Sequence, residues 1–192
     1  MIFINIRPLP VRKIILTLTS LIFLSSISCF ADSFYFTVKS TPYDRQMDRI
    51  RPVLFSKPAA HSGELSLKTV NQWIGDLREI PYGFSAEWKT PAEVNSEPVA
   101  DCKGKAVLLY QRMQAHGAEN IRLVIGRRTP MSHRTHAWLE WATSSGTYVL
   151  DPTINWAAYR TDQLSRGAYV PFYAYSGVRK LRAAPTSLFA AN

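Results

Sequence analysis

The stretch of chain that follows Asp101 and Cys102 is apolar on nearly every side of the helix that it would form. Its core runs from Ala106 to Tyr110, the pattern continues to Met113, and Gly117 supplies a natural stop. A helix that is apolar all round belongs in the interior of a domain. Asp101 is suited to cap this helix, because its carboxylate can accept the free N–H groups of the first turn. Cys102 then lies at the positive end of the helix dipole, where a thiol ionises more readily.

The first 31 residues have the pattern of a secretory signal peptide. Basic residues end at Lys13, an uncharged apolar run rich in serine extends from Ile14 to Phe30, and the small Ala31 suits the position before a cut. A membrane anchor is the alternative, but the apolar run is short for a span and contains several serines. We therefore expect residues 1–31 to be removed. We expect residues 32–192 to form one domain, periplasmic or secreted, with no integral membrane span left.

Charge and cysteine content narrow the function of the remaining 161 residues. The removed segment carries three of the 23 basic residues and none of the 14 acidic ones, so the mature chain has a formal charge of +6. This excess favours acidic partners or anionic surfaces, and no nucleic-acid motif accompanies it. Cys102 is the one cysteine left, unless lipidation at Cys29 retains that residue. A single cysteine in an exported protein indicates an intermolecular bond or a reactive thiol, with a structural cysteine as the alternative.

Periodicity divides the mature chain into helices and strands. Apolar residues recur at helical spacing between Leu67 and Leu77, which predicts a helix from Ser66 to Ile80. After Gly117 the spacing alternates, as in strands. We expect strands at residues 121–126, 135–141 and 147–151, further strands at 34–38 and 170–175, and a turn over 88–93 that leads into a short helix. Residues 45–51 are expected to be polar and exposed, and residues 180–192 to be frayed.

The loop between the strands at 135–141 and 147–151 decides which of their side chains share a face. A two-residue loop at Ser144–Ser145 and a four-residue loop at Thr143–Gly146 give the same register, with Asp151 opposite Trp138. Side chains alternate along a strand, so His136 points to the same face as Trp138. Asp151 and His136 are then diagonal neighbours, roughly 7–8 Å apart at the backbone and within reach of each other. A loop of odd length, or a bulge, would place them on opposite faces.

Cys102, His136 and Asp151 are together the residue types of a thiol catalytic triad. His136 would take the thiol proton and later protonate the leaving group, while Asp151 would hold its tautomer and orientation. The backbone N–H of Cys102 would help to stabilise an oxyanion. Each residue alone has an ordinary structural explanation, and the combination with an unpaired cysteine favours the triad. His133 is the rival base, but it lies in a loop beside Arg134.

Three other residues near Cys102 in the sequence complete the expected site. Trp88 lies in the loop at residues 84–99 that runs directly into Cys102. It either lines a substrate-binding cleft or fills the core, and we take it as the candidate substrate-binding residue. Lys103 and Lys105 are expected to be exposed and to add a screened positive charge near the thiol.

Three motifs resemble the core motifs of the transglutaminase-like superfamily: Asp101-Cys102 opening a helix, the run His136–Glu140, and the run Tyr148–Thr153. The run Trp88–Glu93 resembles the bacterial transglutaminase-like cysteine peptidases in particular, and the resemblance covers about residues 66–153. It implies a papain-like α+β fold, in which a central Cys-bearing helix packs on an antiparallel sheet that carries the His and the Asp. It implies the triad roles given above. Members include periplasmic proteases that release surface adhesins, and relatives carry out amide transfer or deamidation.

The chain departs from the peptidase branch directly after the cysteine. That branch often has acidic residues there, associated with calcium, whereas this chain has Lys103 and Gly104. We therefore expect no metal and no cofactor. The first functional hypothesis is an exported thiol hydrolase that cleaves amide bonds in a protein or peptide of the cell envelope. The alternatives are an acyltransferase or deamidase with the same triad, and a non-catalytic binding module on this fold.

Overall fold

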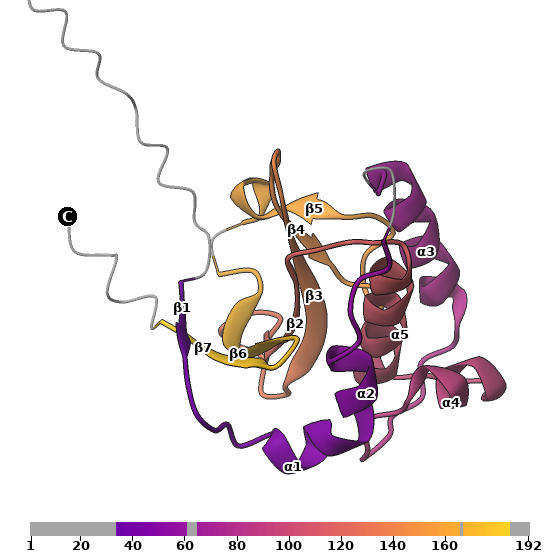
Figure 1. The fold of residues 1–192 in the computed structure, drawn as a ribbon, viewed down its shortest axis with the longest axis horizontal. Helices are drawn as coiled ribbons and strands as arrows, with labels where there is room; N and C mark the ends of the chain where they lie inside the picture. The colour runs from indigo at the N-terminus through magenta and orange to yellow at the C-terminus, as the bar shows by residue number, and fades with distance from the viewer. Residues whose placement is uncertain (1–33, 61–64, 166, 185–192) are drawn as a thin grey trace, which may run out of the picture.

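The computed structural model describes residues 34–60, 65–165 and 167–184 (Figure 1). The expected signal peptide, residues 1–31, lies outside these ranges, and so do Cys29 and the end of the chain from residue 185. Within the described ranges, no helix has both the length and the apolar character needed to cross a membrane.

A seven-stranded sheet runs through the described part of the molecule in the order β1-β7-β6-β2-β3-β4-β5. Each strand in it is antiparallel to its neighbours. The segment expected near residue 34 forms the edge strand β1. The neighbouring strands β2 and β3 lie further inside the sheet and pack against α5. The strands are β1 (Tyr35–Thr37), β2 (Ile121–Arg127), β3 (His136–Thr143), β4 (Gly146–Leu150), β5 (Tyr159–Arg160), β6 (Val170–Ser176) and β7 (Arg179–Ala183).

The helices gather on one side of this sheet (Figure 1). α5 packs directly on β2 and β3, and α2, α3 and α4 pack around α5. The protein therefore has the α+β fold class that the sequence predicts. The helices are α1 (Asp44–Met47), α2 (Arg51–Leu54), α3 (Leu67–Glu79), α4 (Pro91–Ser96) and α5 (Cys102–Ala115), with short 3-10 turns at η1 (Asp48–Ile50) and η2 (Thr161–Gln163).

α5 is the interior helix that its all-round apolar sequence predicts. Ten of its fourteen residues are buried, and they include Cys102 at one end and Gln114 at the other. The sheet below it follows the predicted alternation. Leu123 and Ile125 of β2 join the core under α5, while Val124 faces a second, smaller core on the opposite side of the sheet. The sheet is thus covered on both faces, and α5 is held rigidly against its centre.

Two segments differ from the expectation. Residues 44–54 form a chain of short helices, in which the charged residues Arg45, Asp48, Arg49 and Arg51 are exposed as expected. Ile50 and Leu54 of the same segment are buried in the main core, which the sequence did not predict. Pro52 is compatible with this, because it lies in the first turn of α2, where a missing N–H breaks no hydrogen bond. The segment after residue 178 is also ordered, since β7 pairs with both β6 and β1. In β7, Leu181 is buried between basic residues, so the segment has too few apolar residues for its sequence to predict a strand.

Candidate active site

Cys102 is the first residue of α5, as the sequence predicts. Asp101 caps the helix, and its Oδ1 atom accepts the N–H of Gly104 at 3.0 Å. The residue Cys102 is 8% exposed, so the thiol is nearly but not wholly buried. The first N–H groups of a helix have no acceptor inside the helix. The backbone N–H of Cys102 is therefore available next to its own sulfur.

The carboxylate of Asp101 is fully occupied in holding this end of the helix. Its Oδ2 atom accepts the N–H of Ser85 at 3.3 Å and also bonds to the ammonium of Lys103. The Lys103 ammonium donates in addition to the carbonyl of Ser85 at 2.8 Å. Lys103 is thus a bound counter-ion rather than an exposed lysine, because a buried carboxylate needs a compensating charge. The expectation that this lysine stands free in solvent is wrong.

The hairpin of β3 and β4 brings His136 and Asp151 together. Leu139 lies opposite Leu150, which is the register of an even-length loop. His136 begins β3, and Asp151 follows β4 directly. The Nε2 atom of His136 lies 2.7 Å from Oδ2 of Asp151, whose side chain is fully buried. The prediction that these two side chains share a face is confirmed.

His136 lies between Asp151 and Cys102. Because Asp151 engages Nε2, the Nδ1 atom is the one available to the sulfur of Cys102, to which the side chain is hydrogen-bonded. Burial by itself lowers the pKa of His136, but hydrogen bonds and charge attraction from Asp151 and Cys102 outweigh it and raise this pKa to about 9. The imidazole also stacks on Trp138, with ring centroids 6.1 Å apart. At neutral pH the ring is therefore a positioned cation beside the sulfur.

Tyr169 is part of this site, and the sequence did not reveal it. Its hydroxyl donates to Oδ2 of Asp151 at 2.9 Å and accepts from the side-chain amide of Asn155 at 2.8 Å. Burial and the charge of Asp151 raise the pKa of the Tyr169 hydroxyl, so it stays protonated and donates. The other oxygen of Asp151 accepts the N–H of Thr153 at 3.0 Å. Asp151 is thereby fixed from three sides.

Lys105 lies one turn along α5 from Cys102 and is buried rather than exposed. Its ammonium donates to the carbonyl of Ile80 at 2.6 Å and to that of Arg78 at 3.4 Å, at the end of α3. The free carbonyls of a helix end attract a positive charge. Burial and the nearby Arg78 lower the pKa of Lys105, whereas Asp151 opposes this change. Lys105 thus joins the end of α3 to the helix that bears the cysteine.

Two expected site residues are placed elsewhere. Trp88 is 2% exposed, belongs to the main core, and donates its indole N–H to the side chain of Gln46 at 3.1 Å. This corrects its assignment to a substrate-binding cleft and agrees with the alternative, a core residue. The indole can be buried because its N–H, the one polar group of the side chain, is hydrogen-bonded to Gln46. His133 is exposed in the loop before β3, and the imidazole that bonds Asp151 is that of His136.

The residues around Cys102 do not fit a calcium site. Calcium binds through several oxygen ligands, chiefly carboxylates. Asp101 is the acidic neighbour of the cysteine, and its carboxylate already accepts from Ser85, Lys103 and Gly104. Across the ranges that the structure describes, no three His, Cys, Asp or Glu side chains are grouped so as to hold a metal ion. The Lys103 ammonium supplies the positive charge at this carboxylate.

Comparisons with known proteins bear on the fold. No protein-family model matches the sequence, and no curated protein matches it. Among solved structures, EGTA-treated LapG of Legionella pneumophila matches with a TM-score of 0.53 and 18% identity, over 72% of this chain and 74% of that chain. Calcium-bound LapG matches with a TM-score of 0.53 and 18% identity, over 71% of this chain and 75% of that chain. At this identity the similarity shows the fold, which is the papain-like, transglutaminase-like α+β fold.

Proposed function

We propose that the protein is an exported cysteine peptidase that cleaves amide bonds in a protein or peptide of the cell envelope. The observation that carries the proposal is the chain of contacts from Cys102 through His136 to Asp151, at the start of a buried helix. A fold shared with LapG is compatible with this chemistry. Export rests on the pattern of residues 1–31.

Before acylation, the Sγ–H proton of Cys102 has passed to Nδ1 of His136, which gives a thiolate beside the imidazolium cation. The thiolate then forms a bond to the carbonyl carbon of the substrate amide, and the π electrons of the carbonyl move onto its oxygen. As the tetrahedral intermediate collapses, the C–N bond breaks and the imidazolium gives its proton to the departing amine. The products of this step are a free amine and a thioester on Cys102.

In the second step, water attacks the thioester carbon while His136 takes one of its protons. The C–S bond breaks, the carboxylic acid leaves, and the sulfur departs as the thiolate beside the imidazolium, which keeps the proton taken from water. Asp151 keeps the imidazole in the tautomer and orientation that both steps need. The oxyanion of each intermediate lies next to the free backbone N–H of Cys102, which offers a fixed dipole where negative charge develops.

The direct test is the rate of alkylation of Cys102 by iodoacetamide as a function of pH. Below the His136 pKa of about 9 the imidazolium is present and stabilises the thiolate, so alkylation is expected to remain fast at mildly acidic pH. His136→Ala removes that cation, so the rate should fall at acidic pH and recover only at alkaline pH. A wild-type profile identical to that of His136→Ala would make Cys102 a structural residue and favour the binding-module alternative.

Two variants separate the roles within the triad. Asp151→Asn is expected to weaken turnover but to leave Cys102 partly reactive, because Asp151 orients the base without touching the sulfur. His133→Ala is the matched control for loss of an imidazole, and its alkylation profile should equal that of the wild type. A shifted profile in His133→Ala together with an unchanged one in His136→Ala would reverse the assignment of the base.

Mass spectrometry identifies the reaction and its substrate. Envelope proteins are compared after incubation with the wild type and with Cys102→Ala. New amino termini in the wild-type sample support hydrolysis of peptide bonds. Incorporation of a labelled amine at glutamine, or a gain of about 1 Da at glutamine as the amide becomes an acid, would instead support the acyltransferase or deamidase that shares the thioester step.

A further inference from the structure

A short segment from Pro81 to Ser85 forms a wall beside Cys102. Ala100 donates its N–H to the carbonyl of Pro81 at 3.0 Å, and Gly83 donates to the carbonyl of Ala100 at 3.3 Å. A Cβ atom on Gly83 would lie 2.4 Å from a methyl group of Val99, so only glycine allows this close approach. The wall is therefore fixed to the chain two residues before the cysteine.

Two aromatic rings on this wall are left in solvent. Tyr82 is 58% exposed and Phe84 is 78% exposed. The ammonium of Lys103 lies 5.2 Å from the centre of the Phe84 ring, within the range of a cation–π contact. The wall is anchored by backbone hydrogen bonds, so these rings are held outward next to the reactive thiol rather than hidden in the core. A fixed, exposed aromatic pair beside such a thiol is suited to contact a substrate chain.

Arg134 lies in the segment that leads into His136. It is exposed and precedes His136 by two residues, which at about 3.8 Å per residue places the two Cα atoms within roughly 7 Å. Burial and the charges of Cys102 and Asp101 raise the pKa of Tyr82, and the charge of Arg134 opposes this change, so Arg134 and Cys102 both lie near enough to Tyr82 to act on its hydroxyl. The Asp101 carboxylate is already bonded to Lys103. Arg134 makes no hydrogen bond or ion pair with any other described residue.

We propose that Arg134, together with the rings of Tyr82 and Phe84, forms a subsite beside Cys102 that binds an acidic side chain of an extended polypeptide. The proposal deepens the peptidase assignment and rests on it. A guanidinium without a carboxylate partner can take a substrate carboxylate through two parallel hydrogen bonds. The two rings contact the apolar part of the same chain. The mature formal charge of +6 draws an acidic segment toward the molecule.

The test compares two pools of fluorescein-labelled octapeptides that differ at one fixed position, Glu in one pool and Gln in the other. Binding is measured by anisotropy with Cys102→Ala, which leaves the peptides intact, and cleavage is measured with the wild type. We expect the Glu pool to bind roughly tenfold more tightly, the size of one charge-assisted hydrogen bond, and to lose this preference as salt rises. Equal binding of the two pools, or no binding of either, would overturn the proposal.

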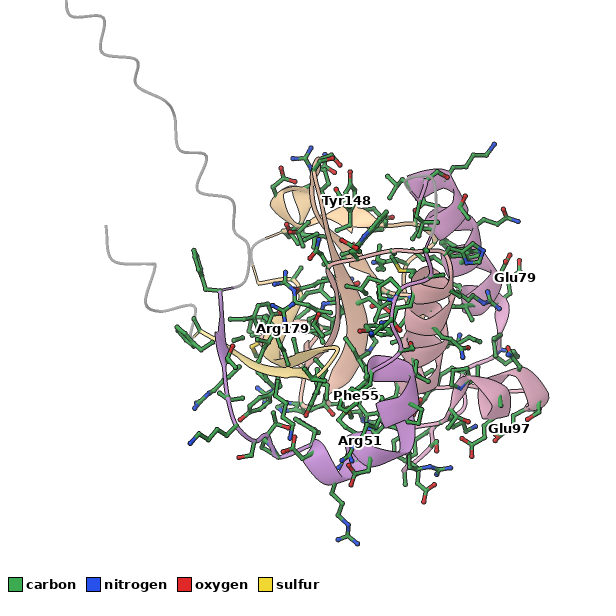
Figure 2. All side chains as sticks on the ribbon, viewed as in Figure 1. Arg51, Phe55, Glu79, Glu97, Tyr148 and Arg179 are labelled. Atoms are coloured by element: carbon green, nitrogen blue, oxygen red, sulfur yellow. The ribbon has the colours of Figure 1, made fainter. Side chains whose placement is uncertain are left out.

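Charge variants locate the preference on Arg134. In the Cys102→Ala background, Arg134→Gln should abolish the preference for Glu, and Arg134→Glu should reverse it. Arg179→Glu is the matched control, because it makes the same change in net charge on the exposed start of β7 (Figure 2). Arg179→Glu should change the Glu-to-Gln ratio by less than about twofold, since exposed charges beyond a Debye length are screened. An equal effect of both reversals would show general charge attraction and no subsite.

The aromatic wall has its own readout. Tyr82→Ala and Phe84→Ala should weaken both pools by a similar factor and leave the Glu-to-Gln ratio unchanged, because the rings contact parts that the pools share. A changed ratio would remove the rings from the proposed arrangement. Preferential binding of Glu peptides without any cleavage by the wild type would keep the subsite and reject the peptidase. Cleavage of both pools at equal rates, with equal binding, would reject the subsite and keep the peptidase.

Discussion

The two ends of α5 bury polar side chains with opposite results. At the carboxyl end, the side-chain N–H of Gln114 donates to the carbonyl of Ser56 at 3.0 Å, and its Oε1 atom accepts the hydroxyl of Ser56 at 2.5 Å. This network is complete within the protein. At the amino end, Asp151 is equally well satisfied, but the chain of contacts continues through His136 to Cys102. Buried polar side chains need hydrogen-bond partners at both ends of α5. At the amino end these partners extend to the sulfur of Cys102.

The largest effect is expected from removing the sulfur at the amino end. Cys102→Ala should lower peptide-bond cleavage by more than about 10³-fold, because the other triad members act only through the sulfur. The free energy of unfolding should change by less than about 1 kcal/mol, since a small side chain replaces another at a nearly closed position. Urea denaturation and a peptide assay measure the two quantities. Activity retained in Cys102→Ala would end the proposed mechanism.

The next effect concerns the carboxyl end. Gln114→Ala removes two hydrogen bonds that join the buried Gln114 to the exposed Ser56, whose hydroxyl keeps its bond to the carbonyl of Val53, and should cost about 1–2 kcal/mol of unfolding free energy. The alkylation rate of Cys102 in the folded protein should not change, because that network is closed on itself. Gln111→Ala is the matched control on the exposed side of α5 and should cost under about 0.5 kcal/mol. Altered thiol reactivity in Gln114→Ala would show that the two ends are coupled.

A smaller effect is expected from Tyr169, which lies between a structural and a catalytic role. Tyr169→Phe removes one hydrogen bond from Asp151, and turnover should fall by about tenfold. With one donor fewer, Asp151 holds the His136 proton more strongly, so the alkaline limb of the pH profile should move to higher pH. Tyr175→Phe, which removes another partly buried hydroxyl on β6, is the control. An unchanged profile in Tyr169→Phe would reduce Tyr169 to a packing residue.

The sequence was sufficient where the contact depends on local geometry. The pairing of His136 with Asp151 follows from the period of a strand and the even length of one loop, and it is confirmed. Tyr169 lies 18 residues beyond Asp151 and reaches it from a residue with φ of 56°, a conformation that no local pattern announces. The burial of Lys105 depends on carbonyls that α3 places above it. Such contacts are decided by the packing of distant segments, which one sequence does not specify.

The same distinction holds for the fold. Strong periodicity predicted α3, α5 and the strands β2, β3 and β4 close to their observed bounds. The short helices at residues 44–54 were not predicted, because a proline and several arginines interrupt the pattern of their few buried residues. β7 was not predicted either. This basic strand at residues 179–183 shows little alternation of polar and apolar residues, and it is stabilised by pairing with β6 and β1. Elements that owe their order to neighbours lack a strong signal of their own.

The smallest effect on Cys102 reactivity and on thermal stability is expected from removing calcium. This test asks which cation balances the charge of Asp101 at the amino end of α5. The Asp101 carboxylate is already paired with the ammonium of Lys103, so EGTA should change neither the alkylation rate of Cys102 nor the melting temperature. Lys103→Ala removes that counter-charge from a buried carboxylate and should lower the stability of the folded state. Scanning calorimetry of both proteins, with EGTA and with added calcium, measures this. A melting temperature of the wild type that rises with calcium would mean that the metal binds the folded protein, and that Lys103 is not the cation this end of the helix uses.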